Sequence, residues 1–160
     1  MKKQISTAKA PAAIGPYSQA IEANGMVFVS GQLPVNPETG EFAEGGIKEL
    51  TRQSLTNMKN ILAEAGLGME NVVKTTVFLA DMADFAAMNE VYASFFEGVA
   101  PARSAVAVKT LPKNALVEIE CIAVRYKAGF CDNVMLQGIS CSIFFVFGER
   151  NRFFLEHLGA

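Results

Sequence analysis

The stretch that is richest in possible chemistry is 117–122, written VEIECI, which has the composition of a strand. Successive side chains of a strand point to opposite faces, so Glu118 and Glu120 share one face while Ile119 and Cys121 share the other. A carboxylate that faces a cleft between subunits could act as a general acid or base. The strand pattern by itself favours the alternative, two ordinary glutamates on a solvent-facing sheet surface.

Arg103 is the second residue with clear chemical potential. It enters a predicted strand directly after Pro101-Ala102, and the proline stiffens this approach, so the guanidinium would be well aimed. Arginine can bind a carboxylate through two parallel hydrogen bonds. A surface arginine paired with a neighbouring acid is the alternative explanation.

Two further positions stand out. In IGPYS (14–18), Gly-Pro presents Tyr17 rigidly, although a turn with a packed tyrosine fits the same residues. Asn89 lies in a predicted helix, where asparagine has poor propensity, and marks either a buried polar contact or an exposed face. Nearby aromatic residues follow helical spacing, which is more typical of a core than of a stacking platform. GQLPVNPETG (31–40) matches neither a phosphate-binding nor a dinucleotide-binding loop.

Composition limits the class of protein. The chain has 160 residues, enough for one domain, with 14 Lys plus Arg and 16 Asp plus Glu, a net charge of −2. This balance gives no basic excess for binding a nucleic acid duplex, so nucleic acid is not an expected partner. The content of 51% hydrophobic and 19% charged residues excludes general disorder and suggests that apolar surface is hidden in an oligomer.

The sequence predicts a reduced, cytoplasmic protein without metal or cofactor. Lys2 and Lys3 are not followed by the apolar run of a signal peptide, and the apolar stretch 139–147 is too short to cross a bilayer. The only histidine is His157, which argues against a histidine-based metal site or catalytic pair in the main body. Three cysteines match no zinc pattern and no disulfide framework: Cys121, Cys131 and Cys141.

Five strands and two helices are expected before residue 125. Strands are predicted at 18–23, 26–31, 72–80, 104–108 and 116–124, the first two joined by the hairpin signal Asn24-Gly25. An apolar stripe at steps of three and four predicts a helix over 47–65, ended by Gly66. A second helix follows Asp84 as N-cap, faces the core with Phe85, Met88, Val91 and Phe95, and ends by Gly98.

The order β-β-α-β-α-β-β has a consequence for assembly. Right-handed crossovers place both helices on the same face of the sheet. No element of the main body remains to cover the other face, so partner subunits are the simplest cover.

Six segments together resemble the reactive-imine deaminase family of the Rid or YjgF type. They cover nearly all of residues 8–125 in the order of the family: APAAIGPYSQAI (10–21), SGQLPVNPETGE (30–41), RQSLTNMKNILAEAGL (52–67), VVKTTVFLADMADFAAMNEVYASFF (72–96), PARSAV (101–106) and LPKNALVEIECIAV (111–124). The resemblance implies an α+β fold like that of chorismate mutase, a mixed sheet with two helices on one face. It also implies a homotrimer around a central barrel, with clefts between neighbouring subunits.

The implied reaction is hydrolysis of 2-imino acids and their enamine tautomers, such as 2-aminoacrylate, to 2-keto acids and ammonia, a form of metabolite damage control. By the family motifs, Arg103 would bind the substrate carboxylate, and Glu118 would orient the attacking water and move protons. Gly31 would line the pocket through its backbone and Tyr17 would close it. Three weaker pocket or support positions are implied as well: Ser30, Asn89 and Ala105.

Three features depart from the family pattern. Position 105 often holds Cys or another small polar residue, whereas this chain has Ala105. The loop 97–100 before Arg103 is shorter than usual and lacks the common aromatic residue. The chain also continues beyond the usual end of the domain, so that 1–126 is the predicted deaminase-like domain and 127–160 an atypical extension. That extension either adds a strand at 139–147 or has no function.

Two other functions stay open at this point. One is an endoribonuclease or translation inhibitor, which the acidic balance and the lack of a histidine in the main body disfavour. The other is a non-enzymatic protein that binds small 2-keto carboxylates with the same Arg103.

Overall fold

The computed structural model describes residues 1–126, which form six strands, two α-helices and three short 3-10 helices. The strands are β1 (Lys3–Ile5), β2 (Ala20–Ala23), β3 (Met26–Gln32), β4 (Val72–Leu79), β5 (Ala102–Ala107) and β6 (Val117–Val124). The helices are α1 (Ile47–Glu64) and α2 (Phe85–Ala93). The 3-10 helices are η1 (Met69–Asn71), η2 (Met82–Asp84) and η3 (Pro112–Asn114).

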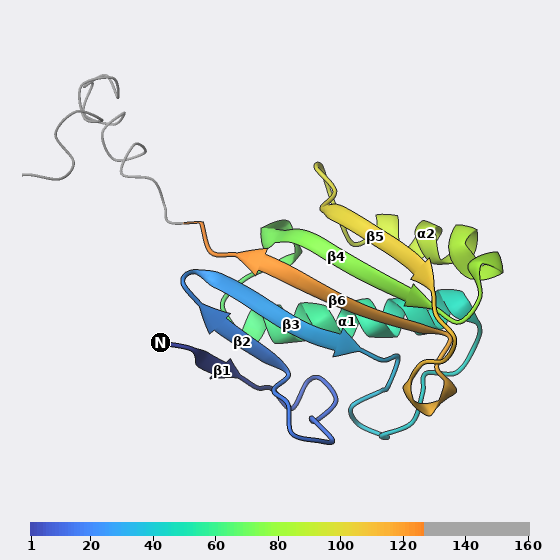
Figure 1. Cartoon of the computed structure of the whole chain (residues 1–160), viewed down its shortest axis with the longest axis horizontal. Helices are drawn as coiled ribbons and strands as arrows, with labels where there is room; N and C mark the ends of the chain where they lie inside the picture. Colours follow the sequence, from blue (N-terminus) through green and yellow to red (C-terminus); the bar gives the residue numbers. More distant parts are fainter. Residues whose placement is uncertain (127–160) are drawn as a thin grey trace, which may run out of the picture. The chain divides into compact units, whose positions relative to one another are not determined.

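All six strands belong to one mixed sheet in the order β1-β2-β3-β6-β4-β5 (Figure 1). Neighbouring strands are antiparallel except β4 and β5, which are parallel and are connected through α2. The last strand of the described region, β6, therefore lies between β3 and β4 in the middle of the sheet. This insertion brings VEIECI against the strand that carries Ser30 and Gly31.

Both helices lie on one face of the sheet, as the crossover argument predicts (Figure 1). The predicted stripe of α1 is buried against β3 and β6, and it includes the fully buried Leu55, Met58 and Ile61. Each such side chain contributes about 1.5–3 kcal/mol by leaving water. Helix α1 begins after Gly46, whose backbone N–H donates to the Glu49 carboxylate at 3.0 Å.

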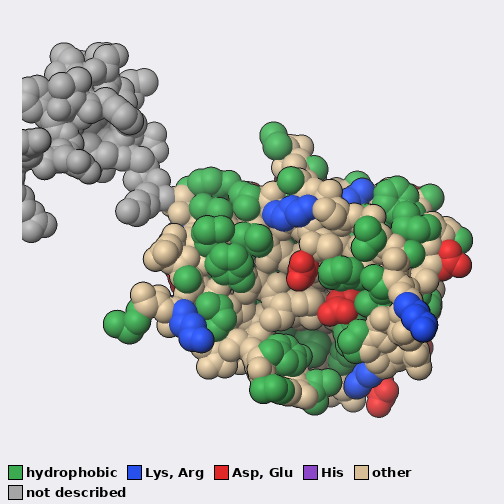
Figure 2. Space-filling view, viewed as in Figure 1, with side chains coloured by type: hydrophobic (Ala, Val, Ile, Leu, Met, Phe, Trp, Pro, Cys, Tyr) green, Lys and Arg blue, Asp and Glu red, His purple; other side chains and the backbone are tan. Residues whose placement is uncertain are grey.

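The opposite face of the sheet is open: no element of residues 1–126 covers it. Along β6 the side chains alternate between buried and half-buried, and Glu118 and Glu120 belong to the half-buried set, as predicted. Figure 2 shows apolar side chains spread over this face with acidic groups near its middle. Phe28 on β3 is 42% exposed and Val106 on β5 is 45% exposed. The uncovered face that the element order predicts is thus confirmed.

The structure differs from the predicted elements at several boundaries. The three-residue edge strand β1 was not predicted, because it is too short to show an alternating pattern. Strand β5 begins at Ala102 rather than at residue 104, because its parallel pairing with β4 starts at Lys74. Asp84 occupies the N-cap position of α2, as predicted, but its side chain makes no capping hydrogen bond. Instead Asp81 caps the preceding turn, its carboxylate accepting from the Ala83 N–H at 2.8 Å. Helix α2 also ends at Ala93, short of Phe95.

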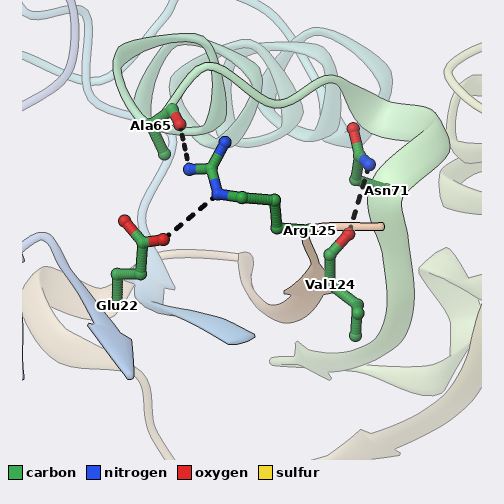
Figure 3. Close-up of polar contacts among 5 residues, drawn as sticks. All are labelled: Glu22, Ala65, Asn71, Val124 and Arg125. Carbon is green, nitrogen blue, oxygen red and sulfur yellow. Dashed lines mark hydrogen bonds and ion pairs between the residues drawn. The ribbon is translucent and has the colours of Figure 1, made fainter. Parts of the chain in front are cut away.

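Arg125 fastens the end of β6 to two other elements (Figure 3). Its guanidinium donates to the Glu22 carboxylate on β2, with Nε 3.2 Å from Oε1, and to the carbonyl of Ala65 after α1. Its backbone N–H donates to Gly25 O at 2.8 Å in the hairpin turn. Asn71 donates to Val124 O at 3.2 Å beside it. The end of the sheet that follows VEIECI is therefore held on two sides.

The C-terminal extension and the question of a membrane span complete the description of the chain. The extension 127–160, with its predicted strand at 139–147, lies outside the described residues. Within residues 1–126, neither helix has the length and apolar character needed to cross a membrane.

Candidate functional site

A cleft of about 650 Å³ lies where β3 ends and β6 begins. Its walls come from the N-terminal loop around Pro11 to Tyr17, from the segment after β3, and from η3. Four of the predicted site residues line it together, namely Tyr17, Ser30, Gly31 and Glu118. Its remaining lining is largely apolar, so a charged group inside it is partly withdrawn from water.

A β-bulge shapes the floor of this cleft. Val29 pairs with Cys121 and Gln32 pairs with Ile119, so Ser30 and Gly31 together face the single residue Glu120. A side chain at position 31 would overlap the Glu118 carboxylate, because a Cβ built on Gly31 meets the carboxylate carbon at 2.7 Å. Only glycine therefore permits the present place of Glu118 over the backbone of β3.

Glu118 is placed to exchange protons. Burial raises the pKa of its carboxyl above the usual value of 4.5, and the negative charge of Glu120 raises it further. The residues 1–126 provide no hydrogen-bond or ion-pair partner for this carboxylate. A carboxyl group with a raised pKa and free lone pairs, in a cleft, is suited to general acid or base catalysis.

Gln19 holds the N-terminal wall of the cleft, a role that the sequence reasoning missed. The residue is 3% exposed, and its amide nitrogen donates to the carbonyls of Thr7, Ala10 and Pro11 at 3.0, 3.2 and 2.7 Å. Its amide oxygen accepts from the N–H of Thr7 at 2.7 Å. The loop that carries Tyr17 is thereby tied to β2.

Asn57 holds the facing wall and was missed as well. It is fully buried in α1, and its amide nitrogen donates to Leu33 O at 3.1 Å and to Val35 O at 2.8 Å. An asparagine inside a helix has poor propensity, and that signal was available in the sequence. Ser30 also has an anchoring role, because its hydroxyl donates to Ser18 O at 2.8 Å.

Arg103 lies on the other face of the sheet. It pairs with Thr75 of β4, whereas Glu118 pairs with Phe78, and positions three residues apart on a strand point to opposite faces. The guanidinium carbon lies 4.5 Å from the ring centroid of Tyr92 and 5.5 Å from that of Phe85, both on α2. Within one copy of the chain, Arg103 and Glu118 therefore do not share a cleft.

Two of the three weaker predicted positions, Asn89 and Ala105, fall on the side of Arg103. Asn89 is half-buried on α2, at helical spacing from both Phe85 and Tyr92. Ala105 shares the face of Arg103 on β5 and packs against the core. The structure thus divides the predicted residues into two groups, one around Glu118 and one around Arg103.

Other features of the described region offer less chemistry. Cys121 is buried, and burial raises the pKa of its thiol to about 12, which makes it a poor nucleophile. Residues 1–126 contain no group of three or more histidine, cysteine or acidic side chains arranged to hold a metal ion. A second cavity of about 500 Å³, beside α1 and the end of α2, contains none of the predicted site residues.

The mixed sheet with two helices on one face makes this an α+β protein, and comparison with known proteins identifies the family. Residues 7–125 match the family model described as Endoribonuclease L-PSP. A solved structure of a member of the conserved Rid protein family from Yersinia pestis is 49% identical, with a TM-score of 0.76, over 78% of this chain and 99% of that one.

Curated relatives have more specific names. A Mus musculus protein named 2-iminobutanoate/2-iminopropanoate deaminase is 50% identical over 78% of this chain and 93% of its own length. Reactive Intermediate Deaminase A, chloroplastic, from Arabidopsis thaliana is 54% identical over 76% of this chain and 65% of its own length. The chain belongs to the Rid family, which confirms the resemblance found in its motifs.

Proposed function

We propose that this protein hydrolyses reactive 2-imino acids and their enamine tautomers, such as 2-aminoacrylate, to 2-keto acids and ammonia. The observation that carries the proposal is the Glu118 carboxyl, which has a raised pKa and lies in a cleft built around Gly31. The names of the Mus musculus and Arabidopsis thaliana relatives agree with this chemistry.

In the proposed reaction, Glu118 accepts a proton from water while the water oxygen bonds to the imine carbon. The resulting carbinolamine has one new C–O bond, and the C=N bond has become a single bond. Glu118 returns this proton to nitrogen. The hydroxyl proton then passes to nitrogen through the same carboxyl group as the keto group forms, and ammonia leaves with the C–N electron pair. An enamine first takes up a proton at its terminal carbon and loses one from nitrogen, which gives the imine.

Arg103 has the complementary task of binding the substrate carboxylate through parallel hydrogen bonds. Neutralising that charge lets the water approach the imine carbon without repulsion and fixes the reacting geometry. Since Arg103 and Glu118 point to opposite faces of one chain, a neighbouring copy must supply one of them. We place the reaction in clefts between subunits of a homotrimer whose open sheet faces meet around a central barrel.

Two substitutions test this assignment. R103A and E118Q should each lower the rate of imine hydrolysis by at least a hundredfold while leaving the oligomeric mass unchanged, because each removes a group that acts on the substrate and neither residue belongs to the buried core. The matched controls are R52A and E90Q, which alter exposed residues of α1 and α2. Loss of imine is followed spectroscopically after generating it in the assay. Full activity in R103A or E118Q would contradict the proposal.

An endoribonuclease is the second candidate, because that word describes the matching family model. Cleavage of RNA that persists through purification and disappears in E118Q would support it. Binding of 2-keto acids without turnover of imines would instead indicate a carboxylate-binding protein.

A further inference from the structure

We propose that Tyr92 and Phe85 of α2 form an aromatic platform that positions the Arg103 guanidinium for the substrate carboxylate, an inference that rests on the proposed deaminase function. The guanidinium carbon lies 4.5 Å from the Tyr92 ring centroid and 5.5 Å from the Phe85 ring centroid. Both distances are within the range of about 6 Å in which an aromatic ring attracts a cation. Helix α2 would thus contribute two positioning residues to the site.

The Tyr92 ring is itself held in place. Its side chain is buried, with the residue only 5% exposed, and its hydroxyl lies 2.6 Å from the hydroxyl of Thr75 on β4. Thr75 is also the strand partner of Arg103 in the parallel pair of β4 and β5. A single residue of β4 therefore fixes both the backbone from which Arg103 extends and the ring over which its guanidinium lies.

This mode of support leaves the donors of the arginine available. An aromatic face attracts the guanidinium through its charge and plane, whereas a carboxylate partner would occupy its N–H groups. Among residues 1–126 the ion pairs join Lys48 to Glu90 and Arg125 to Glu22, and no side-chain hydrogen bond includes Arg103. An arginine that is ordered before binding loses less conformational freedom when the substrate arrives.

Kinetics of three variants test the platform. Y92L and F85L should raise the KM for 2-iminobutanoate and the Kd for its product 2-oxobutanoate about three- to tenfold each, with a smaller change in kcat. Y92F keeps the ring and loses only the hydroxyl, so its KM should stay near that of the wild type even if its melting temperature falls. V91A is the matched control, because it removes a buried side chain from the same helix and leaves both aromatic rings unchanged.

A second measurement does not depend on turnover. A guanidinium over an aromatic face experiences a ring-current shift, so the Arg103 Hε resonance, assigned with R103K, should lie upfield in the wild type and in Y92F. It should move toward the ordinary position in Y92L.

The possible results test the aromatic platform and the proposed reaction independently of each other. If Y92L and F85L change KM and Kd no more than V91A, or if Y92F changes them as much as Y92L, the platform is overturned. An unshifted Hε resonance in the wild type would overturn it too. A wild-type protein that hydrolyses no imine would remove the proposed function, and the Kd values and the Hε shift would still decide on the platform.

Discussion

At the scale of single residues, the candidate site depends on how the surroundings of Glu118 change the pKa of its carboxyl group. The carboxyl group has a raised pKa because the cleft removes it from water and because Glu120 adds a second negative charge on the same face. Two other titratable residues line the cleft with Glu118, namely Lys113 of η3 and Tyr17 of the N-terminal loop. Glu120, two residues further along β6, therefore raises the proton affinity of Glu118.

The sign of this coupling gives a pH prediction. As a base, Glu118 works when deprotonated, so kcat/KM should fall on the acid side at a pH above that expected for an ordinary glutamate. E120Q removes a negative charge about 7 Å away, lowers the pKa of Glu118 and should move the acid limb down by about half a pH unit.

The measurement is the pH dependence of kcat/KM for wild type, E120Q and the surface control E90Q. E90Q should leave the acid limb where it is, since Glu90 is exposed on α2. A uniform loss of activity in E120Q, with no movement of the limb, would show that Glu120 supports the structure and does not tune Glu118.

At the scale of elements, buried amides hold the walls of the cleft to the core. Gln19 ties the N-terminal loop to β2, and Asn57 ties the segment after β3 to α1. Arg125 holds the far end of β6 against β2 and the end of α1 (Figure 3). The strand that carries Glu118 is thus fixed at one end by an ion pair and faces walls that hydrogen bonds keep in place.

The substitution Q19E tests this support. It keeps the shape of the side chain but replaces an amide donor, which faces three carbonyls, with an acceptor. We expect the free energy of unfolding to fall by about 2–3 kcal/mol at neutral pH, because buried carbonyls lose their donor. We also expect a higher KM, because the loop carrying Tyr17 is loosened.

Urea unfolding monitored by circular dichroism measures the change. Q4E makes the same substitution on the exposed face of β1 and should alter stability by less than about 0.5 kcal/mol. Equal effects of Q19E and Q4E would show that the Gln19 bonds do not hold the wall.

At the scale of the whole molecule, the open sheet face and the division of the site point to the same assembly. Apolar side chains are spread over this face (Figure 2). By strand register the exposed Phe28 and Val106 belong to it. The two groups of predicted site residues, around Glu118 and around Arg103, lie on opposite faces of one sheet. Both facts are explained if copies of the chain pack together so that the Arg103 region of one meets the Glu118 cleft of the next.

The variant F28K should therefore break both the assembly and the activity. A lysine on the open face opposes burial of that face between copies, because its charge would have to leave water. Light scattering should give close to three times 17.2 kDa for the wild type and a mass near 17.2 kDa for F28K, with imine hydrolysis lost in parallel.

M82K places the same charge on the 44% exposed Met82 of η2, which precedes α2, and should change neither the mass nor the activity. Circular dichroism checks that F28K still folds. A folded F28K that keeps the wild-type mass and activity would contradict an assembly through the open face.

The sequence by itself determined the features that repeat locally. The apolar stripe of α1, the hairpin at Asn24-Gly25 and the alternation along VEIECI follow from helix and strand periods, and each is observed. The uncovered face follows from counting elements. The family was predicted from motifs spread along residues 10–124, because such motifs are recognised by residue type and order along the chain alone.

Only the tertiary structure decided which residues meet. Pairing between β6 and its neighbours is long-range, so its place between β3 and β4, the bulge at Ser30-Gly31 and the anchoring bonds of Gln19 have no local signal of comparable strength. The same pairing sets the face of each side chain: a register that places Arg103 opposite Thr75 and Glu118 opposite Phe78 turns them away from each other. Register depends on contacts between distant segments, and therefore only the folded sheet could show that one chain holds two separate halves of the proposed site.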